Sequence, residues 1–289
     1  MIRENAESFI IPLLVAMLYI SFLQIPLEEL KKAFKNKRFT LTSITINFIW
    51  TPFIAWLFAL MFLGDHPALY IGFIMLLVTP CTDWYLIFTG IAKGNVALSA
   101  AILPLNLILQ VILLPFYLLI FGETTGDIQL NFLVEGILFV LIIPLTLAVL
   151  TKRLLRSQPH VKKNIIVRLN IFPMVLLGFA IVAMFASQGK IFLDHLDLMW
   201  KISIPFLLFF FVNFFIGQTV GKWMRFPKPD IVSLSLTTLA RNSPIALAIA
   251  MTAFPEQPLI SLTLVIGPLL ELPILATITQ VLIGISKGK

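Results

Sequence analysis

Residues 67–92 read PALYIGFIMLLVTPCTDWYLIFTGIA, an apolar run with the polar break TPCTD at 79–83. Residues 231–254 read IVSLSLTTLARNSPIALAIAMTAF, a second apolar run with the break RNSP at 241–244. Proline ends or kinks a helix because it lacks an N–H donor and clashes with the preceding turn. In a bilayer, an interrupted helix is tolerated only where its freed backbone groups face protein or water. The two runs therefore predict two crossed broken helices that surround a polar site near the middle of a membrane.

The composition of the chain is that of a membrane protein. Of its 289 residues, 59% are hydrophobic and 12% are charged, whereas soluble domains average about 45–50% and about 25%. The longest stretch between apolar runs, 151–168, leaves no room for a soluble catalytic or nucleic-acid-binding domain. We expect an all-α integral membrane protein with nine transmembrane helices, because nine runs can cross the ~30 Å core of a bilayer. These runs are 8–25, 39–63, 67–92, 95–121, 130–150, 169–187, 199–221, 231–254 and 259–283.

The basic residues indicate on which side of the membrane each loop lies. Most of the 21 Lys and Arg residues fall in alternate loops, at 26–38, at Lys93, at 151–168 and at 222–230, and in the C-terminal tail. Cytoplasmic loops are enriched in Lys and Arg. This alternation predicts an N-terminus outside and a C-terminus in the cytoplasm, with the chain in the plasma (inner) membrane.

A repeat relates the two halves of the chain. Adding 161 to the residue numbers superimposes the first four runs on the last four, whereas 130–150 has no counterpart. Matched runs are an odd number of crossings apart, which predicts an inverted repeat whose first helix, of a ten-helix plan, is missing. The first repeat would be residues 1–122, with four helices, and the second 123–289, with five. The alternative is that evenly spaced helices align by chance.

Inverted repeats provide two interchangeable gates around one central site, which is the basis of alternating access in transporters. We therefore expect two bundles. Helices 1, 5 and 6 would form a panel, and helices 2–4 and 7–9 would form a core that holds the crossed breaks.

Three charged residues lie deep within the apolar runs: Asp83, Arg241 and Glu271. An ionisable side chain at the centre of a membrane helix costs ~2.5–3.5 kcal/mol, so each must face protein or water. One interpretation is an Asp83–Arg241 ion pair that clamps the breaks together; the other is a substrate or proton site, and the two are compatible. Gln110 matches Glu271 under the repeat and completes this expected charge network, although a buried amide often serves only as an interhelical hydrogen bond.

Polar residues at and near the breaks are candidates for binding a solute: Cys81, Thr82, Asn106, Asn242 and Ser243. A lone buried cysteine is usually a packing residue, but a thiol at a break in mid-membrane is also a soft ligand for a thiophilic solute. One cysteine excludes an intramolecular disulfide and a multi-cysteine metal site. The pattern G-x-S-x-G at 284–288 has no strand before it and no histidine after it, so it does not indicate a hydrolase. We expect no enzyme activity, cofactor or metal.

The turn AKGNVALS at 92–99 follows the broken helix that holds Cys81. With these residues the chain resembles the bile acid:sodium symporter superfamily, and within it the arsenite-efflux permeases. The resemblance implies that Cys81 matches the cysteine that those permeases require for arsenite transport. It also implies that Asn242 matches a residue of their second break and that Asn106 matches a residue in the helix after their first break. Glu271, within 267–273, would match a residue of their last helix.

The chain departs from the sodium symporters of that superfamily at the second break. Those symporters carry a Glu-x-x-x-Gln-Asn pattern there, whose Glu and Gln bind sodium, whereas this chain has Thr237 and Arg241 at the two places. At the first break, Asp83-Trp84 replaces their Gly-Gly. An arginine in place of a sodium ligand argues against sodium coupling and leaves Glu271 as the titratable group for coupling to protons.

We therefore expect a secondary transporter that exports arsenite, or a similar small metalloid or anion, in exchange for protons. Cys81 would supply a soft contact, and Asn106 and Asn242 would supply hydrogen bonds. The alternative on the same fold is a sodium-coupled importer of an organic anion. The remoter alternatives are a membrane-embedded enzyme and a channel. An enzyme would need a catalytic constellation, which the sequence does not show, and a channel needs no paired broken helices. The expected partners are a small solute, protons and lipid, with no nucleic acid.

Overall fold

The computed structural model describes residues 2–25, 35–82, 84–122, 135–136, 138–155, 168–169, 171–194 and 196–287. Its helices before the second break are α1 (Ile2–Gln24), α3 (Lys37–Thr45), the π-helical η2 (Ile46–Trp50), α4 (Thr51–Leu63), α5 (Pro67–Val78), α6 (Trp84–Ile91), α7 (Val96–Gly122), the π-helical η4 (Leu138–Ile142), α9 (Ile143–Leu154), α11 (Phe172–Asp194), α12 (Leu196–Trp223) and α13 (Lys228–Leu239). After that break come α14 (Ser243–Ala253) and α15 (Pro258–Lys287). Within these ranges the only pairing of strand type is an isolated bridge between Pro80 and Arg241. The described chain is thus all-helical, as predicted.

Helix ends differ from the predicted runs mainly where a helix continues beyond its apolar part. The helix α11 extends to Asp194, beyond the predicted run 169–187, and α12 begins at Leu196, before the predicted run 199–221. Apolar content predicts the part of a helix that lies in hydrocarbon, but polar residues can continue the helix outside it. Of the predicted run 130–150, the structure describes 135–136 and 138–150, and the remainder lies outside the described residues.

Four helical stretches of the described chain are long and apolar enough to cross a membrane: Lys37–Leu63, Val96–Phe121, Leu198–Trp223 and Pro258–Ile285. Shorter apolar helices cover Ser8–Gln24, Pro67–Val78, Phe172–Ser187 and Ser243–Ala253. Two of these, within α5 and α14, are short because a break interrupts the segment to which they belong.

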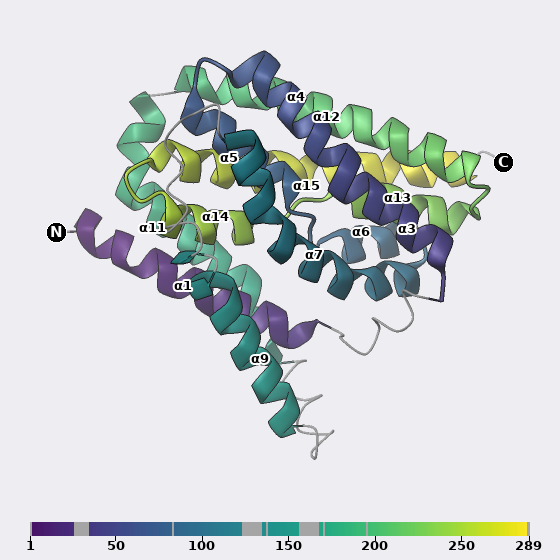
Figure 1. The fold of residues 1–289 in the computed structure, drawn as a ribbon, viewed down its shortest axis with the longest axis horizontal. Helices are drawn as coiled ribbons and strands as arrows, with labels where there is room; N and C mark the ends of the chain where they lie inside the picture. Colours follow the sequence, from purple (N-terminus) through teal and green to yellow (C-terminus); the bar gives the residue numbers. More distant parts are fainter. Residues whose placement is uncertain are drawn as a thin grey trace.

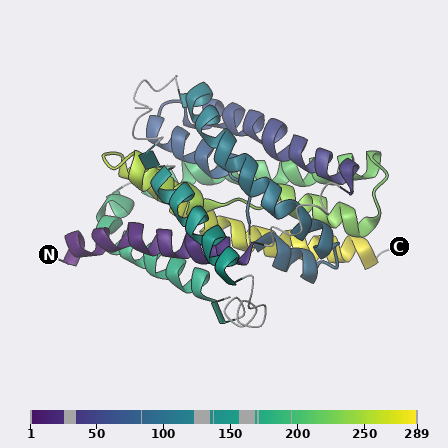
Figure 2. The same cartoon turned by 60° about the horizontal axis from the view of Figure 1, so that its bottom comes forward.

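The helices α1, α9 and α11 pack together at one side of the molecule (Figure 1). The course of α1 beside α11 is also visible in Figure 2. Among the other helices, α5 packs on α4 and α15, and α12 packs on α4 and α13. A Cβ added at Gly72 would lie 2.8 Å from the Thr263 Cβ of α15, and one at Gly217 would lie 3.0 Å from the Ser235 Oγ of α13. Small residues thus permit close helix packing here, as they commonly do in membranes.

Both predicted interruptions are present, and the local sequence explains where they begin. The helix α5 ends at Val78, and its C-cap Thr79 is extended (φ −103°, ψ 100°) because a residue before proline disfavours helical geometry. The helix α13 ends at Leu239, and its C-cap Ala240 is also extended (φ −71°, ψ 139°). The next helix, α14, begins after Asn242, whose Oδ1 accepts a hydrogen bond from the Ile245 N–H at 3.3 Å and so caps the new helix.

Candidate functional site

The two breaks lie against each other as a short antiparallel pair. The Cys81 N–H donates to the Ala240 carbonyl at 3.0 Å, and the Asn242 N–H donates to the Thr79 carbonyl at 2.7 Å. These bonds satisfy backbone groups that the interrupted helices leave without helical partners. Side chains join as well, since the Asn242 Nδ2 donates to the Thr82 Oγ1 at 3.1 Å. The crossing therefore brings together three residues predicted for the solute site: Cys81, Thr82 and Asn242.

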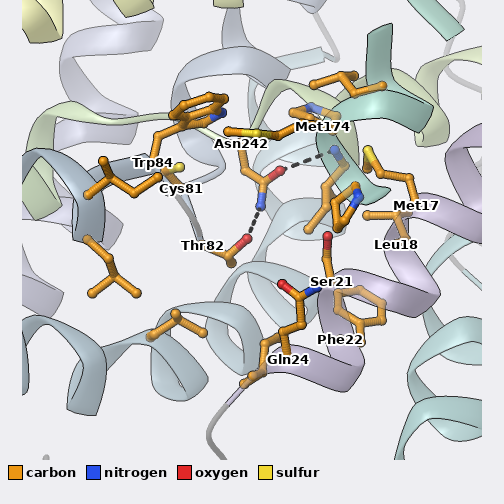
Figure 3. A pocket seen from close by; sticks show the side chains of 18 of the residues that line it. Met17, Leu18, Ser21, Phe22, Gln24, Cys81, Thr82, Trp84, Met174 and Asn242 are labelled. Carbon is orange, nitrogen blue, oxygen red and sulfur yellow. Dashed lines mark hydrogen bonds between the residues drawn. The ribbon is translucent and has the colours of Figure 1, made fainter. Parts of the chain in front are cut away.

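A cavity of about 540 Å³ lies between this crossing and the helices α1 and α11 (Figure 3). The polar residues that the breaks contribute to its wall are Cys81, Thr82, Arg241 and Asn242, and α1 contributes the polar side chains of Ser21 and Gln24. Most of the other lining residues are apolar. A mostly apolar cavity with a few placed polar groups is the usual form of a small-molecule site.

Three sulfur atoms border the cavity, each from a different element (Figure 3). Cys81 comes from the first break, Met17 from α1 and Met174 from the N-terminal part of α11. Thiols and thioethers are soft ligands that favour soft, thiophilic species. The two methionines were missed by sequence reasoning, because a methionine in an apolar run has the same pattern as any lipid-facing residue.

Two of the predicted residues, Asn106 and Gln110, do not line this cavity. Both are buried in α7, and their side-chain amides have no hydrogen-bond partner among the described residues. The predicted contact of Asn106 with a solute, and the predicted place of Gln110 in a charge network, stay predictions.

Ser243 is directed toward α15, where its hydroxyl donates to the Leu264 carbonyl. Four residues later in α15 stands Pro268, which has no N–H to donate to that carbonyl. Ser243 therefore replaces a missing helical hydrogen bond and joins the second break to α15. Its predicted contact with the solute stays a prediction. A proline four residues after a buried acceptor is the sequence signal that could have indicated this bond.

The second break is also attached to α15 through Glu271. The Arg241 N–H donates to the Glu271 Oε1 at 2.9 Å, and both residues are buried, at 2% exposure. The Arg241 guanidinium extends to carbonyl groups of α5 and α13. Asp83 lies outside the described residues, so the predicted Asp83–Arg241 ion pair stays a prediction.

The turn between α6 and α7 is bonded to the start of α13. Lys93 adopts the left-handed conformation (φ 57°), which reverses the chain. The Asn95 Nδ2 then donates to the Asp230 Oδ1 at 2.8 Å, and the Ser233 Oγ donates to the Asn95 carbonyl at 3.0 Å. The residues that carry the family resemblance thus connect the two broken segments at a second place.

Comparison with known proteins identifies the family of the chain. The Sodium Bile acid symporter family matches residues 11–195, well over half of the chain. The Arsenical-resistance protein Acr3 of Corynebacterium glutamicum is 24% identical over 275 residues, which cover 91% of this chain and 74% of that protein. The Arsenical-resistance protein Acr3 of Alkaliphilus metalliredigens is 21% identical over 282 residues, covering 92% and 78%. The uncharacterized protein YbaS of Bacillus subtilis is 24% identical over 270 residues, covering 92% and 86%.

A symporter moves solutes across a membrane, and the apolar helices described above agree with that setting. The chain is therefore an integral membrane transporter, not an enzyme, and it belongs to the Sodium Bile acid symporter family.

Proposed function

We propose that this protein is a secondary active transporter that exports arsenite, or a similar small metalloid or anion, in exchange for protons. The observation that carries the proposal is the position of Cys81, at the crossing of the two breaks and on the wall of a cavity that Met17 and Met174 also border. Trivalent arsenic binds sulfur strongly, and soft ligands select soft species. Two relatives are named arsenical-resistance proteins, which supports the same solute.

The proposed architecture has nine transmembrane helices in an inverted repeat that lacks its first helix. In this scheme α1, α9 and α11 form the panel, and the remaining helices form the core. The packing of α1 on α9 and α11 supports the panel, and the cavity lies between α1 and α11 and the crossed breaks. Alternating access by movement of one bundle against the other needs a central site at such a boundary.

The proposed location is the plasma (inner) membrane. In the proposed orientation the N-terminus lies outside the cell and the C-terminus lies in the cytoplasm. The charge pattern of the loops supports it. The cavity is bordered by Gln24 at the end of α1 and by Met174 near the start of α11. Both helix ends would face the cytoplasm in this orientation, so we infer that the structure is an inward-facing state.

Proton coupling is proposed to depend on Glu271, a buried carboxyl attached to the second break. Protonation of this side chain would alternate with occupation of the cavity by solute. The alternative, a sodium-coupled importer of an organic anion, would need a cation ligand at a place where this chain has Arg241. A channel would not need two crossed breaks, so we regard transport by alternating access as the better account.

The test is a comparison of solutes in vesicles that contain the purified protein. We expect Cys81→Ser to lower arsenite flux by about tenfold or more, which corresponds to about 1.4 kcal/mol of lost interaction. Flux of any transported carboxylate should be affected much less. Met17→Leu and Met174→Leu should lower arsenite flux to a smaller extent. Met75→Leu is the matched control, because Met75 is buried in α5 and does not line the cavity.

Arsenite flux at the wild-type rate in Cys81→Ser would contradict the proposed site. Equal losses in Met17→Leu, Met174→Leu and Met75→Leu would show that the methionine effects arise from packing and not from contact with the solute.

A further inference from the structure

The guanidinium of Arg241 is surrounded by oxygen acceptors. Its Nη1 donates to the Leu77 carbonyl at 2.9 Å, and its Nε donates to the Leu239 carbonyl at 3.1 Å. Its Nη2 donates to the Asn47 Oδ1 at 3.1 Å and to the Thr238 carbonyl. The side chain is 2% exposed, and among the described residues these four oxygens accept four of the five N–H groups of the guanidinium.

Three of the four oxygens belong to the last turn of a helix that ends at a break. Leu77 lies in the last turn of α5, and Thr238 and Leu239 lie in the last turn of α13. Carbonyls in the last turn lack a helical donor and form the negative end of the helix dipole. Two helix C-termini therefore meet at one buried positive charge. The ring of Phe209, on α12, lies with its centroid 5.2 Å from the Arg241 Cζ and adds a cation–π contact.

The same oxygens would suit an alkali cation. Carbonyl and amide oxygens are ligands for hard cations, and the C-terminal ends of broken helices coordinate sodium in secondary transporters. In this chain a guanidinium already occupies their lone pairs, and a second cation among them would be repelled. The residues at the crossing therefore do not fit a sodium ion, although the family takes its name from sodium symport.

We propose that Arg241 is a permanently attached cation that replaces a bound alkali ion at the crossing of the breaks. Because the guanidinium is covalently attached, it cannot leave during a transport cycle, so it stabilises the crossing without coupling transport to an ion gradient. Coupling must then come from another group. Only this statement about coupling rests on the proposed function. The charge of Arg241 and its four acceptors belong to the fold, whichever solute the protein carries.

The test removes the Arg241 side chain and measures whether a free cation can bind in the space that it leaves. In Arg241→Ala, the four oxygens would face a space that a small cation could enter. The melting temperature of the purified protein would be measured in matched millimolar chlorides of guanidinium, sodium and choline. We expect guanidinium or sodium to raise it by roughly 3–5 °C relative to choline. The wild type should show no such difference.

Arg153→Ala is the matched control for loss of an arginine, because Arg153 is exposed in the last turn of α9. Should Arg241→Ala fail to fold, Arg241→Lys and Arg241→Gln give the same information. Lysine keeps the positive charge and should melt well above glutamine, which does not.

Two results would overturn the proposal: a folded Arg241→Ala protein whose melting temperature is the same in all three salts, or equal melting temperatures for Arg241→Lys and Arg241→Gln. The outcome is independent of arsenite. Ion-dependent stability together with no arsenite flux in the wild type would reject the proposed solute and support the built-in cation.

Discussion

Replacement of Ser243 by alanine should destabilise the fold, because it removes the donor that compensates for Pro268. In a regular helix the N–H of residue 268 would donate to the Leu264 carbonyl. Proline has no N–H, and the Ser243 hydroxyl donates to that carbonyl instead. Leu264 is 0% exposed and Ser243 2%, so water has little access to the carbonyl. An unsatisfied buried acceptor costs about 1–3 kcal/mol, which is the expected loss of unfolding free energy in Ser243→Ala.

The same reasoning predicts a rescue by a second substitution. Pro268→Ala restores an N–H that can donate to the Leu264 carbonyl within α15. Ser243→Ala should then cost little, so the coupling energy of the double-mutant cycle should be about 1–3 kcal/mol. Ser203→Ala is the matched control. The Ser203 hydroxyl donates to the Met199 carbonyl at 2.7 Å, but the Ser203 N–H is the helical donor to that carbonyl, so the loss should be below about 0.5 kcal/mol.

The cycle can be measured by denaturant unfolding of the purified proteins in detergent micelles, with the melting temperature as a second readout. No coupling between the substitutions at 243 and 268 would refute the reasoning. The same would follow if Ser243→Ala were no more destabilising than Ser203→Ala.

Three further predictions concern packing, orientation and coupling. Gly72→Ala should lower the unfolding free energy by about 1–3 kcal/mol, because the added Cβ would lie 2.8 Å from a side chain of α15. The control is Gly178→Ala, whose Cβ meets nothing within 4 Å, so it should leave the unfolding free energy unchanged. Equal melting temperatures of the two variants would argue against this close contact. In a cysteine-free background, a cysteine that replaces Asp65 should react with an impermeant thiol reagent added outside. A cysteine that replaces Lys35 should react only from the cytoplasmic side. Labelling at 35 from outside would show that the proposed orientation is wrong. Glu271→Gln keeps an acceptor for its backbone partner but cannot titrate, so it should fold and lose most proton-driven flux; unchanged flux would remove Glu271 from the coupling mechanism.

The breaks could be predicted from the sequence because their causes are local. Pro80 and Pro244 stand beside polar residues within otherwise apolar runs, and the side chain of Asn242 can cap a new helix. The apolar length of each run likewise predicts a helix from the cost of leaving backbone groups unpaired in lipid. Such features depend on a few neighbouring residues, so their positions agree with the structure to within a few residues.

The partners of Arg241 could not be predicted in the same way. A sequence pattern reveals charged side chains, so it predicts a pair with Asp83, which lies outside the described residues and stays a prediction. Among the described residues, the acceptors of the guanidinium are mainly backbone carbonyls of α5 and α13. Every residue has a carbonyl, and only the fold determines which ones lack a helical donor and face a common point. Met17 and Met174 were missed for a related reason, because the cavity wall forms from helices that are distant in sequence.

The central claim is proton-driven export of a thiophilic solute, and arsenite uptake into everted membrane vesicles tests it most directly. In such vesicles the cytoplasmic face of the membrane is outside, so an exporter loads the lumen. The account predicts that an acidic lumen drives arsenite accumulation and that an imposed sodium gradient has no effect at constant pH. Accumulation of an organic anion that follows the sodium gradient and ignores pH would contradict it and would favour a sodium-coupled importer.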